Sequence, residues 1–150
     1  MLEALEASAL AGFLRGSFVV YPLVNALHIL AIGALVTTAV LMDLRVLGLG
    51  RRIDTETVIG LLRPIAITAL AVAVLSGLAL FSVQPVDYWD NSAFRLKLLL
   101  LALALANALA FTSFRLHCRA EQVGPRAMAV LSIALWISVA MSGRFIGFLA

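Results

Sequence analysis

The chain has 150 residues, of which 63% are hydrophobic and only 13% are charged. Soluble domains are about half apolar and about a quarter charged, so this composition excludes a water-soluble globule. A mean hydropathy of +1.09 is typical of multi-pass membrane proteins, because surface that faces lipid needs no polar coat. The net charge of +3 does not indicate a nucleic-acid partner, since the basic residues stand in loops between apolar runs, where they encode topology.

The chain begins with a segment, at about residues 2–16, that we expect to form a short helix in the membrane interface. Leu5, Phe13 and Leu14 share a rough helical face, with Glu6 and Arg15 on the other side. Acidic residues stand here where a secretory signal would carry Lys or Arg. We therefore expect this segment to remain in the mature chain.

Four apolar runs follow, at about residues 18–42, 61–83, 96–114 and 127–147. Each is close to the roughly 20 residues that cross about 30 Å of hydrocarbon as a helix. Loops are short and no repeat is visible, so we predict one all-α domain, an integral membrane four-helix bundle. Basic residues are more numerous around the first and third connections, which predicts that both termini face outward, toward the periplasm in a Gram-negative cell.

Small residues recur at four-residue spacing in two of the spans. Ala69, Ala73 and Gly77 form one such stripe in the second span. A second stripe in the third span contains Ala102, Ala106 and Ala110. This spacing lets helix backbones approach closely in lipid, so we expect both spans to be well packed.

Polar residues mark the ends of the spans. Asp43 closes the first span in this interpretation, and we expect it to pair with Arg45 or with other loop bases at the inner interface. Asp54, or the threonine after it, is predicted to cap a short helix that leads into the second span. Asn91, or the serine after it, is predicted to cap the third.

Polar groups inside the spans are the main functional clue, because a polar side chain in hydrocarbon costs free energy unless it finds a partner. Counting about 1.5 Å per residue places His28 roughly 10–15 Å and Asn107 about 16 Å below the outer surface. We therefore predict that these two side chains face one another in one layer. The residues expected to form an outward-open site there are His28, Tyr21, Asn25, Lys97, Asn107, Trp136 and Arg144.

An imidazole beneath two cations is suited to a redox cofactor. His28 can ligate the iron of a b-type haem while Lys97 and Arg144 hold its propionates. A haem held by both histidines is disfavoured, because His117 lies beyond the opposite end of its span, about 15 Å or more from His28 along the normal. A quinone, a lipid head group or a copper ion is an alternative occupant. Copper would find His28 and Met141 in the outer half and Met42, His117, Cys118 and Met128 near the inner boundary.

Other interpretations remain open. His28 can be packing glue that bonds to an asparagine, and Trp136 and Met141 more simply fill the core. A structural or assembly subunit of a larger membrane complex, without a cofactor, is then the alternative function. No carboxylate pair, metal-hydrolase spacing or nucleophile elbow indicates an enzyme, and proton-coupled transport ranks last. Besides lipid, we expect other membrane subunits or a second copy of the chain as partners.

The chain contains, in this order, the strings SFVVYPLVNALHILAIGALV, LMDLRVLGLG, LSGLALF, DNSAFRLKLLLLALALANALAF and SGRFIGFLA. With these strings the chain resembles an uncharacterised family of bacterial four-span inner-membrane proteins, distantly similar to the membrane domain of copper-resistance D proteins. The resemblance implies a bacterial inner membrane. In that family a histidine often follows the third-span phenylalanine, whereas here Thr112 follows Phe111. The positions that match are Tyr21, Pro22, His28, Asp43, Arg45, Gly77, Phe81, Asn91, Phe94, Lys97, Asn107, Gly143 and Arg144.

Overall fold

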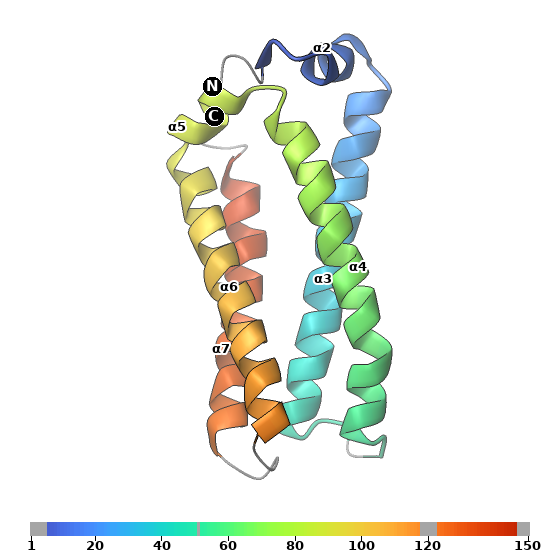
Figure 1. Ribbon diagram of the computed structural model, residues 1–150, viewed down its shortest axis with the longest axis vertical. Coiled ribbons are helices and arrows are strands. Elements are labelled where there is room, and N and C mark those ends of the chain that lie inside the picture. The colour runs from blue at the N-terminus through green and yellow to red at the C-terminus, as the bar shows by residue number, and fades with distance from the viewer. Residues whose placement is uncertain (1–5, 51, 118–122, 147–150) are drawn as a thin grey trace.

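The computed structural model describes residues 6–50, 52–117 and 123–146. Within these ranges the protein is an all-α, multi-pass membrane four-helix bundle, because each of its four long helices is long and apolar enough to cross a membrane. The long helices are α3 (Val20–Leu47), α4 (Thr55–Phe81), α6 (Ser92–His117) and α7 (Val123–Phe145), and the short ones are α2 (Ala9–Gly16) and α5 (Pro85–Asp90). Both short helices lie at one end of the bundle, which we call the terminal end (Figure 1). The opposite end, with the α3–α4 connection, is the loop end.

The long helices extend beyond the predicted apolar runs. They contain 28, 27, 26 and 23 residues, which corresponds to about 35–42 Å at about 1.5 Å per residue. Since the hydrocarbon layer is about 30 Å thick, their ends reach the head-group level or the helices tilt. The helix expected before the second span is part of α4, which starts at Thr55 and includes Pro64. Likewise α3 continues to Leu47, so Asp43 lies one turn inside the helix and is buried, rather than closing the span.

Local hydrogen bonds explain where the helices begin and end. The Asp54 carboxylate accepts from the backbone N–H groups of Glu56 and Thr57, at 2.9 and 3.2 Å, and so caps α4 as predicted. These bonds, that of Thr57 first, hold the pKa of the Asp54 carboxyl below its usual value. Asn91 caps α6 as predicted, since its Oδ1 accepts from the Ala93 N–H at 2.9 Å. The side-chain amide of Asn91 donates to the Ile146 carbonyl at 3.4 Å, which joins the start of α6 to the chain beyond α7.

Among the described residues Asp43 forms an ion pair neither with Arg45 nor with another base of the loop, so that prediction is wrong there. The Arg45 Nε–H donates instead to the backbone carbonyl of Ile53 at 2.9 Å. This bond ties the end of α3 to the loop that leads into α4. Gly48 ends α3 in the left-handed conformation, with φ of 105°, where a side chain would be strained. Asp43 is turned away from this loop because its side chain is buried within the bundle.

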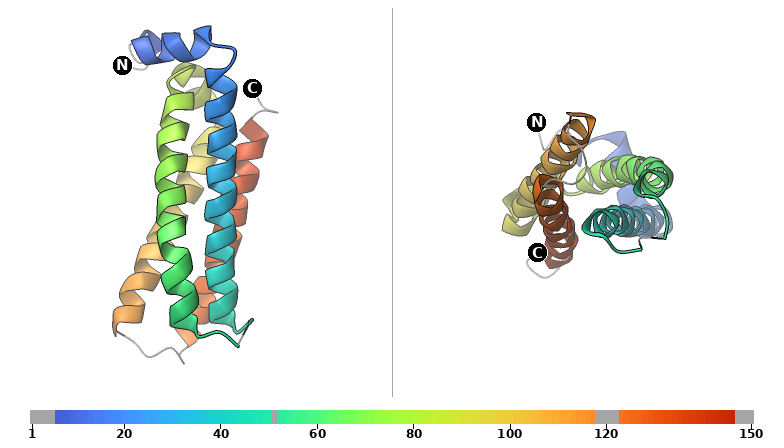
Figure 2. Two further views of the ribbon diagram at one scale, coloured as in Figure 1. Left: turned by 90° about the vertical axis from the view of Figure 1, so that its right-hand side faces the viewer. Right: turned by 90° about the horizontal axis from the view of Figure 1, so that it is seen from below.

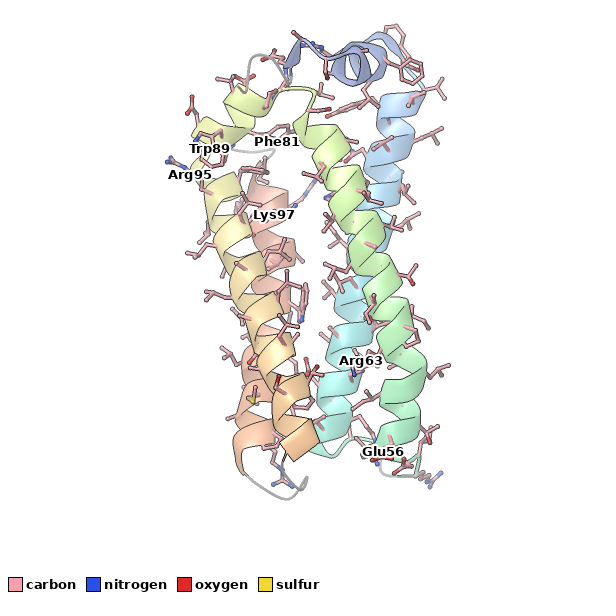
Figure 3. All side chains as sticks on the ribbon, in the orientation of Figure 1. Glu56, Arg63, Phe81, Trp89, Arg95 and Lys97 are labelled. Carbon is pink, nitrogen blue, oxygen red and sulfur yellow. The ribbon has the colours of Figure 1, made fainter. Side chains whose placement is uncertain are left out.

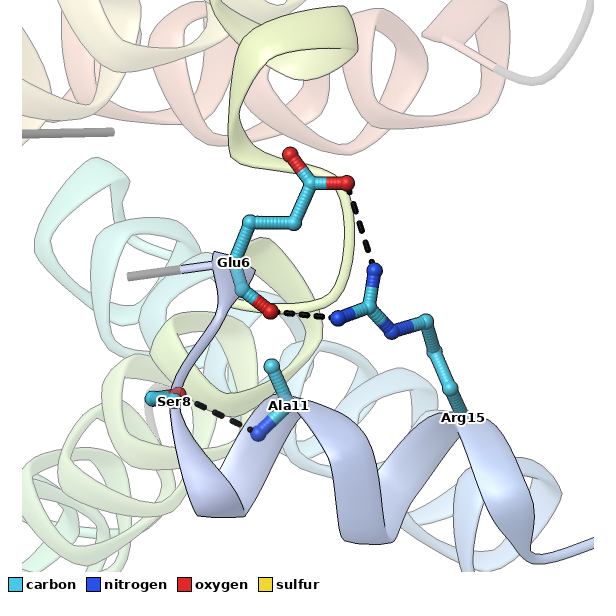
Figure 4. Close-up of polar contacts among 4 residues, drawn as sticks. All are labelled: Glu6, Ser8, Ala11 and Arg15. Carbon is cyan, nitrogen blue, oxygen red and sulfur yellow. Dashed lines mark hydrogen bonds and ion pairs between the residues drawn. The ribbon is translucent and has the colours of Figure 1, made fainter. Parts of the chain in front are cut away.

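Helix α2 confirms the expected amphipathic helix over residues 9–16, while residues 1–5 lie outside the described chain. It runs across the terminal end of the bundle (Figures 1 and 2). Ala11 and Leu14 are buried. Ser8 caps the helix by accepting from the Ala11 N–H at 3.3 Å. Arg15 reaches back to the carboxylate of Glu6 at 3.2 Å and also donates to the Glu6 backbone carbonyl (Figure 4).

The long helices pack as two hairpins. Contacts are extensive between α3 and α4, between α6 and α7, and between α3 and α7, whereas α4 and α6 barely touch. Seen along the bundle, α3 and α4 lie on one side and α6 and α7 on the other (Figure 2). The core between them is formed by Leu35, Ala39, Ala66, Ala69, Ala104 and Trp136.

This arrangement separates the two alanine stripes. Ala69 and Ala73 of α4 are buried against neighbouring helices, as predicted. Ala102, Ala106 and Ala110 of α6 are all exposed, so the packing expected of the third span's stripe is wrong. The spacing shows that a backbone can be approached closely, but which face meets a neighbour depends on helix rotation.

Candidate functional site

His28 lies on α3 and its ring meets α4. The ring Nδ1 is 3.0 Å from the Ser76 hydroxyl oxygen. That hydroxyl is only 2.6 Å from the carbonyl of Val72, which is the better acceptor for its single proton. The Ser76 oxygen therefore accepts from Nδ1–H, and the Ala73 carbonyl is a second acceptor beside the ring. This network assigns the proton to Nδ1 and leaves the lone pair on Nε2.

The His28 imidazole packs directly against Gly77 of α4. A Cβ at this position would stand 2.9 Å from Cε1 and 3.5 Å from Nδ1 of His28. Such a distance is shorter than real Cβ contacts, so any side chain at Gly77 would displace the ring or the helix. The stripe that predicted close packing in the second span thus ends on a residue that positions His28.

The other hairpin brings a cation to the same layer. Lys97 of α6 is half-buried, and its ammonium acts electrostatically on the His28 ring. Its side chain points from α6 toward α4 (Figure 3). The side chain also reaches Gly143 of α7, where a Cβ would stand in contact with the Lys97 Nζ at 3.4 Å. Lys97 therefore lies between the α3–α4 pair that holds His28 and Gly143 of α7. That His28 and Lys97 form one binding site stays a prediction.

Aromatic residues link three helices at the terminal end. Phe81 of α4 and Phe94 of α6 stack with ring centroids 5.3 Å apart, and Tyr88 of α5 lies against both. Tyr88 also hydrogen-bonds to Tyr21 of α3. Burial, together with Tyr21, raises the pKa of Tyr88 to about 12. Tyr21, predicted as a site residue, thus belongs to this aromatic cluster at the terminal end.

Three other predicted residues lie near the surface in the terminal half. Asn25 and Arg144 are exposed, Arg144 in the last turn of α7. The Met141 side chain is 54% exposed among apolar residues of the outer surface, which gives no support to a copper site made with His28. The His117 side chain and Cys118 fall outside what the structure describes. Among the described residues, no three or more His, Cys, Asp or Glu side chains gather into a metal-binding group.

Asn107 does not face His28, so the central geometric prediction is wrong. Its side-chain amide donates to the backbone carbonyl of Met128, near the start of α7, at 3.1 Å. Counted from Ser92 at about 1.5 Å per residue, Asn107 lies about 22 Å along α6, whereas His28 lies about 12 Å along α3 from Val20. The predicted depth was too small because α6 begins four residues before its apolar run.

A second polar group, which sequence reasoning missed, lies in the loop half. A cavity of about 590 Å³ there takes lining residues from all four long helices. Trp136, predicted near His28, is only 4% exposed and forms part of the cavity wall and of the core. The polar lining residues are Asp43, Arg63, Asn107, Thr112 and Ser132. Asp43 was missed because it was assigned to the end of the first span, whereas it lies inside α3. Arg63 was missed because it was counted only as one of the basic residues around the first connection, whereas it lies inside α4.

Comparison with known proteins adds no relative: no family model, no curated protein and no solved structure matches the chain. The resemblance described above stays a prediction. Functional inference therefore rests on the geometry of the two polar groups.

Proposed function

We propose that the chain is a membrane subunit that holds a redox cofactor at His28, with a b-type haem favoured over a copper ion. The observation that carries the proposal is the orientation of the ring. Because the Ser76 hydroxyl already donates to Val72, it accepts from Nδ1–H, and Nε2 is left as a lone-pair donor. Metal-binding histidines almost always donate their other N–H to such a protein acceptor, which fixes tautomer and ring orientation.

The donor set favours haem over copper. A haem brings four nitrogen ligands of its own and needs one or two from the protein, whereas a copper ion needs several soft protein ligands. In the described part of the chain His28 has no partner of that kind, since Met141 is exposed. Lys97 would repel a metal cation but would attract the carboxylate of a propionate.

Bound haem would supply one-electron transfer, and the chain's own residues would hold it. His28 would ligate the iron, Ser76 would keep the ring in the correct tautomer, and Lys97 would hold a propionate. The proposal assigns the chain no catalytic reaction of its own.

The direct test is a visible absorption spectrum with metal analysis of the protein purified from native membranes in mild detergent. We expect a Soret band, a shift on reduction and close to one iron per chain or per pair of chains. His28→Ala should lose both the band and the iron. His117→Ala, which removes the chain's other histidine, should keep them.

A rescue experiment separates ligation from folding. His28→Gly purified with imidazole should regain the Soret band, because free imidazole can enter the space left by the ring. Wild-type protein without iron or a Soret band, or a band unchanged by His28→Ala, would contradict the proposal. Copper in place of iron, lost on His28→Ala, would identify the alternative cofactor.

A structural subunit without a cofactor is the second candidate, and the exposed alanine face of α6 favours it. Ala102, Ala106 and Ala110 let another helix approach closely, and the His28–Ser76 bond then acts only as interhelical glue. Ala106→Leu should abolish co-purification with a partner subunit in this case. Thr37→Ala, at an exposed position of α3, is the control that should leave it unchanged.

A further inference from the structure

The cavity in the loop half opens toward lipid between α4 and α6. Its wall includes Ile67 of α4 and Leu109 of α6, which are 59% and 70% exposed, and the two helices barely touch. A volume of about 590 Å³ is within the ordinary range of small-molecule sites, roughly 300–1,000 Å³. Most of the wall is apolar, so a lone ion or a few waters would leave it poorly filled.

One end of the cavity presents a carboxylate that lacks a donor. Asp43 is 9% exposed, and its Oδ2 is buried without a hydrogen-bond partner among the described residues. Ser132 of α7 serves the carboxylate as a side-chain hydrogen-bond partner. Buried polar atoms are rarely left unsatisfied, because each costs the free energy of its lost hydration. Because Asp43 lines the cavity, an occupant that brings an N–H or O–H group to the carboxylate could satisfy this oxygen once the side chain turns toward it.

A cation lies on the neighbouring wall. Arg63 of α4 lines the same cavity, and its side chain is exposed. The ion pair of Arg15 with Glu6 is the one found in the described residues, so Arg63 and Asp43 do not neutralise each other directly. A head group that is both a donor and an anion complements this pair of charges.

The heights of the two charges match the order of groups in a phospholipid. Asp43 lies four residues, about 6 Å, from the loop end of α3, which is about where hydrocarbon ends for a helix of this length. Arg63 lies eight residues, about 12 Å, from the start of α4 and so is deeper. In an amine phospholipid the ammonium is likewise outermost and the phosphate is next toward the chains.

We propose that this cavity binds one phospholipid with a primary-amine head, whose ammonium donates to Asp43 and whose phosphate accepts from Arg63. Its acyl chains leave between α4 and α6 along the apolar wall. An oxidised quinone fits less well, because it offers no donor to the carboxylate and no anion to the guanidinium. The site is separate from His28 and does not depend on a cofactor there.

Native mass spectrometry of the intact, delipidated chain tests the proposal with an N-methylated lipid series. The probes are phosphatidylethanolamine, its mono- and dimethyl forms and phosphatidylcholine with identical acyl chains, each added in competition with the others. We expect one lipid per chain and roughly tenfold preference for the ethanolamine lipid over phosphatidylcholine, since the last methyl removes the last N–H donor.

Variants locate the two contacts. Asp43→Asn should abolish the preference for the amine lipid, and Glu56→Gln, an exposed carboxylate near the same end, should leave it intact. Arg63→Gln should weaken retention of every phospholipid in the series by a similar factor, and Arg52→Gln, an exposed cation outside the cavity lining, is its control. Circular dichroism of each variant confirms that the bundle is folded.

Equal retention of the ethanolamine and choline lipids by the wild-type chain would overturn the proposal without any variant. A preference that survives Asp43→Asn would overturn it too, because the donor would then bind elsewhere. Stoichiometric quinone in the purified protein, in place of phospholipid, would also refute it.

Discussion

The terminal half and the loop half of the bundle both hold polar side chains between helices, but they satisfy them differently. In the terminal half His28 is bonded to Ser76, rests on Gly77 and lies near Lys97. In the loop half the Asp43 carboxylate faces a cavity with one oxygen unpaired in the described structure. The proposed cofactor depends on the first arrangement, and the proposed phospholipid depends on the second.

Helix pairing explains the difference. The His28–Ser76 bond lies in the tight α3–α4 hairpin, where small residues bring the backbones together. The cavity lies between the hairpins, where α4 and α6 barely touch. Substitutions that enlarge the cavity or crowd the His28 ring therefore test whether the two halves are packed differently.

The largest expected effect is that of Trp136→Ala, which removes a cavity wall and a core side chain that is 4% exposed. We expect a loss of about 3 kcal/mol in the free energy of unfolding, near the lower limit for such substitutions because lipid is itself apolar. Unfolding in detergent measures it. Trp89→Ala is the matched control, since Trp89 is 50% exposed. An equal loss in both variants would show that the core between the hairpins is not the stabilising element.

Gly77→Ala should crowd the terminal half. The new Cβ would stand 2.9 Å from the His28 ring, so we expect a loss of about 1–3 kcal/mol by overpacking. Any cofactor spectrum that depends on His28 should change with it. Gly33→Ala on α3 is the control, because a Cβ there meets nothing within 4 Å, and it should be neutral or slightly stabilising. A Gly77→Ala protein as stable as Gly33→Ala would refute the close contact.

Asn107→Ala should have a smaller effect. It removes the hydrogen bond to the Met128 carbonyl, and such interhelical bonds in membranes contribute about 0.6 kcal/mol on average. Unfolding measurements should show this loss with no change in the His28-dependent spectrum, because Asn107 lies in the other half. Loss of the spectrum on this substitution would restore the abandoned prediction that His28 and Asn107 share one site.

The smallest effect concerns the Asp54 cap of α4 and its pH dependence. Native hydrogen bonds lower the pKa of Asp54 below 3.8, so the charged carboxylate stabilises the folded state above that pH. This contribution should disappear as pH falls through the lower, native value. We expect Asp54→Ala to melt slightly earlier than wild type at neutral pH, with the difference shrinking on acidification. A difference that grows at low pH would contradict the assigned direction.

Much of the fold could be predicted because it depends on local patterns. The apolar runs mark the four spans, and Asp54 and Asn91 mark the starts of α4 and α6. The ends of the spans were predicted least well, because a helix can continue beyond the hydrocarbon layer until a capping residue ends it. That error placed Asp43 at the end of the bundle, whereas it is buried inside, and placed Asn107 too close to His28.

Sequence alone therefore determined that the protein lies in a membrane, that it has four long helices and that His28 and Lys97 lie in the same half. Hydropathy follows from the residue types, and depth follows from position along a helix. Only the tertiary structure decided that His28 binds Ser76, that Asn107 binds Met128 and that Asp43 faces a cavity. The reason is rotational: an apolar helix in lipid has little amphipathic signal, so packing against its neighbours sets which face turns inward.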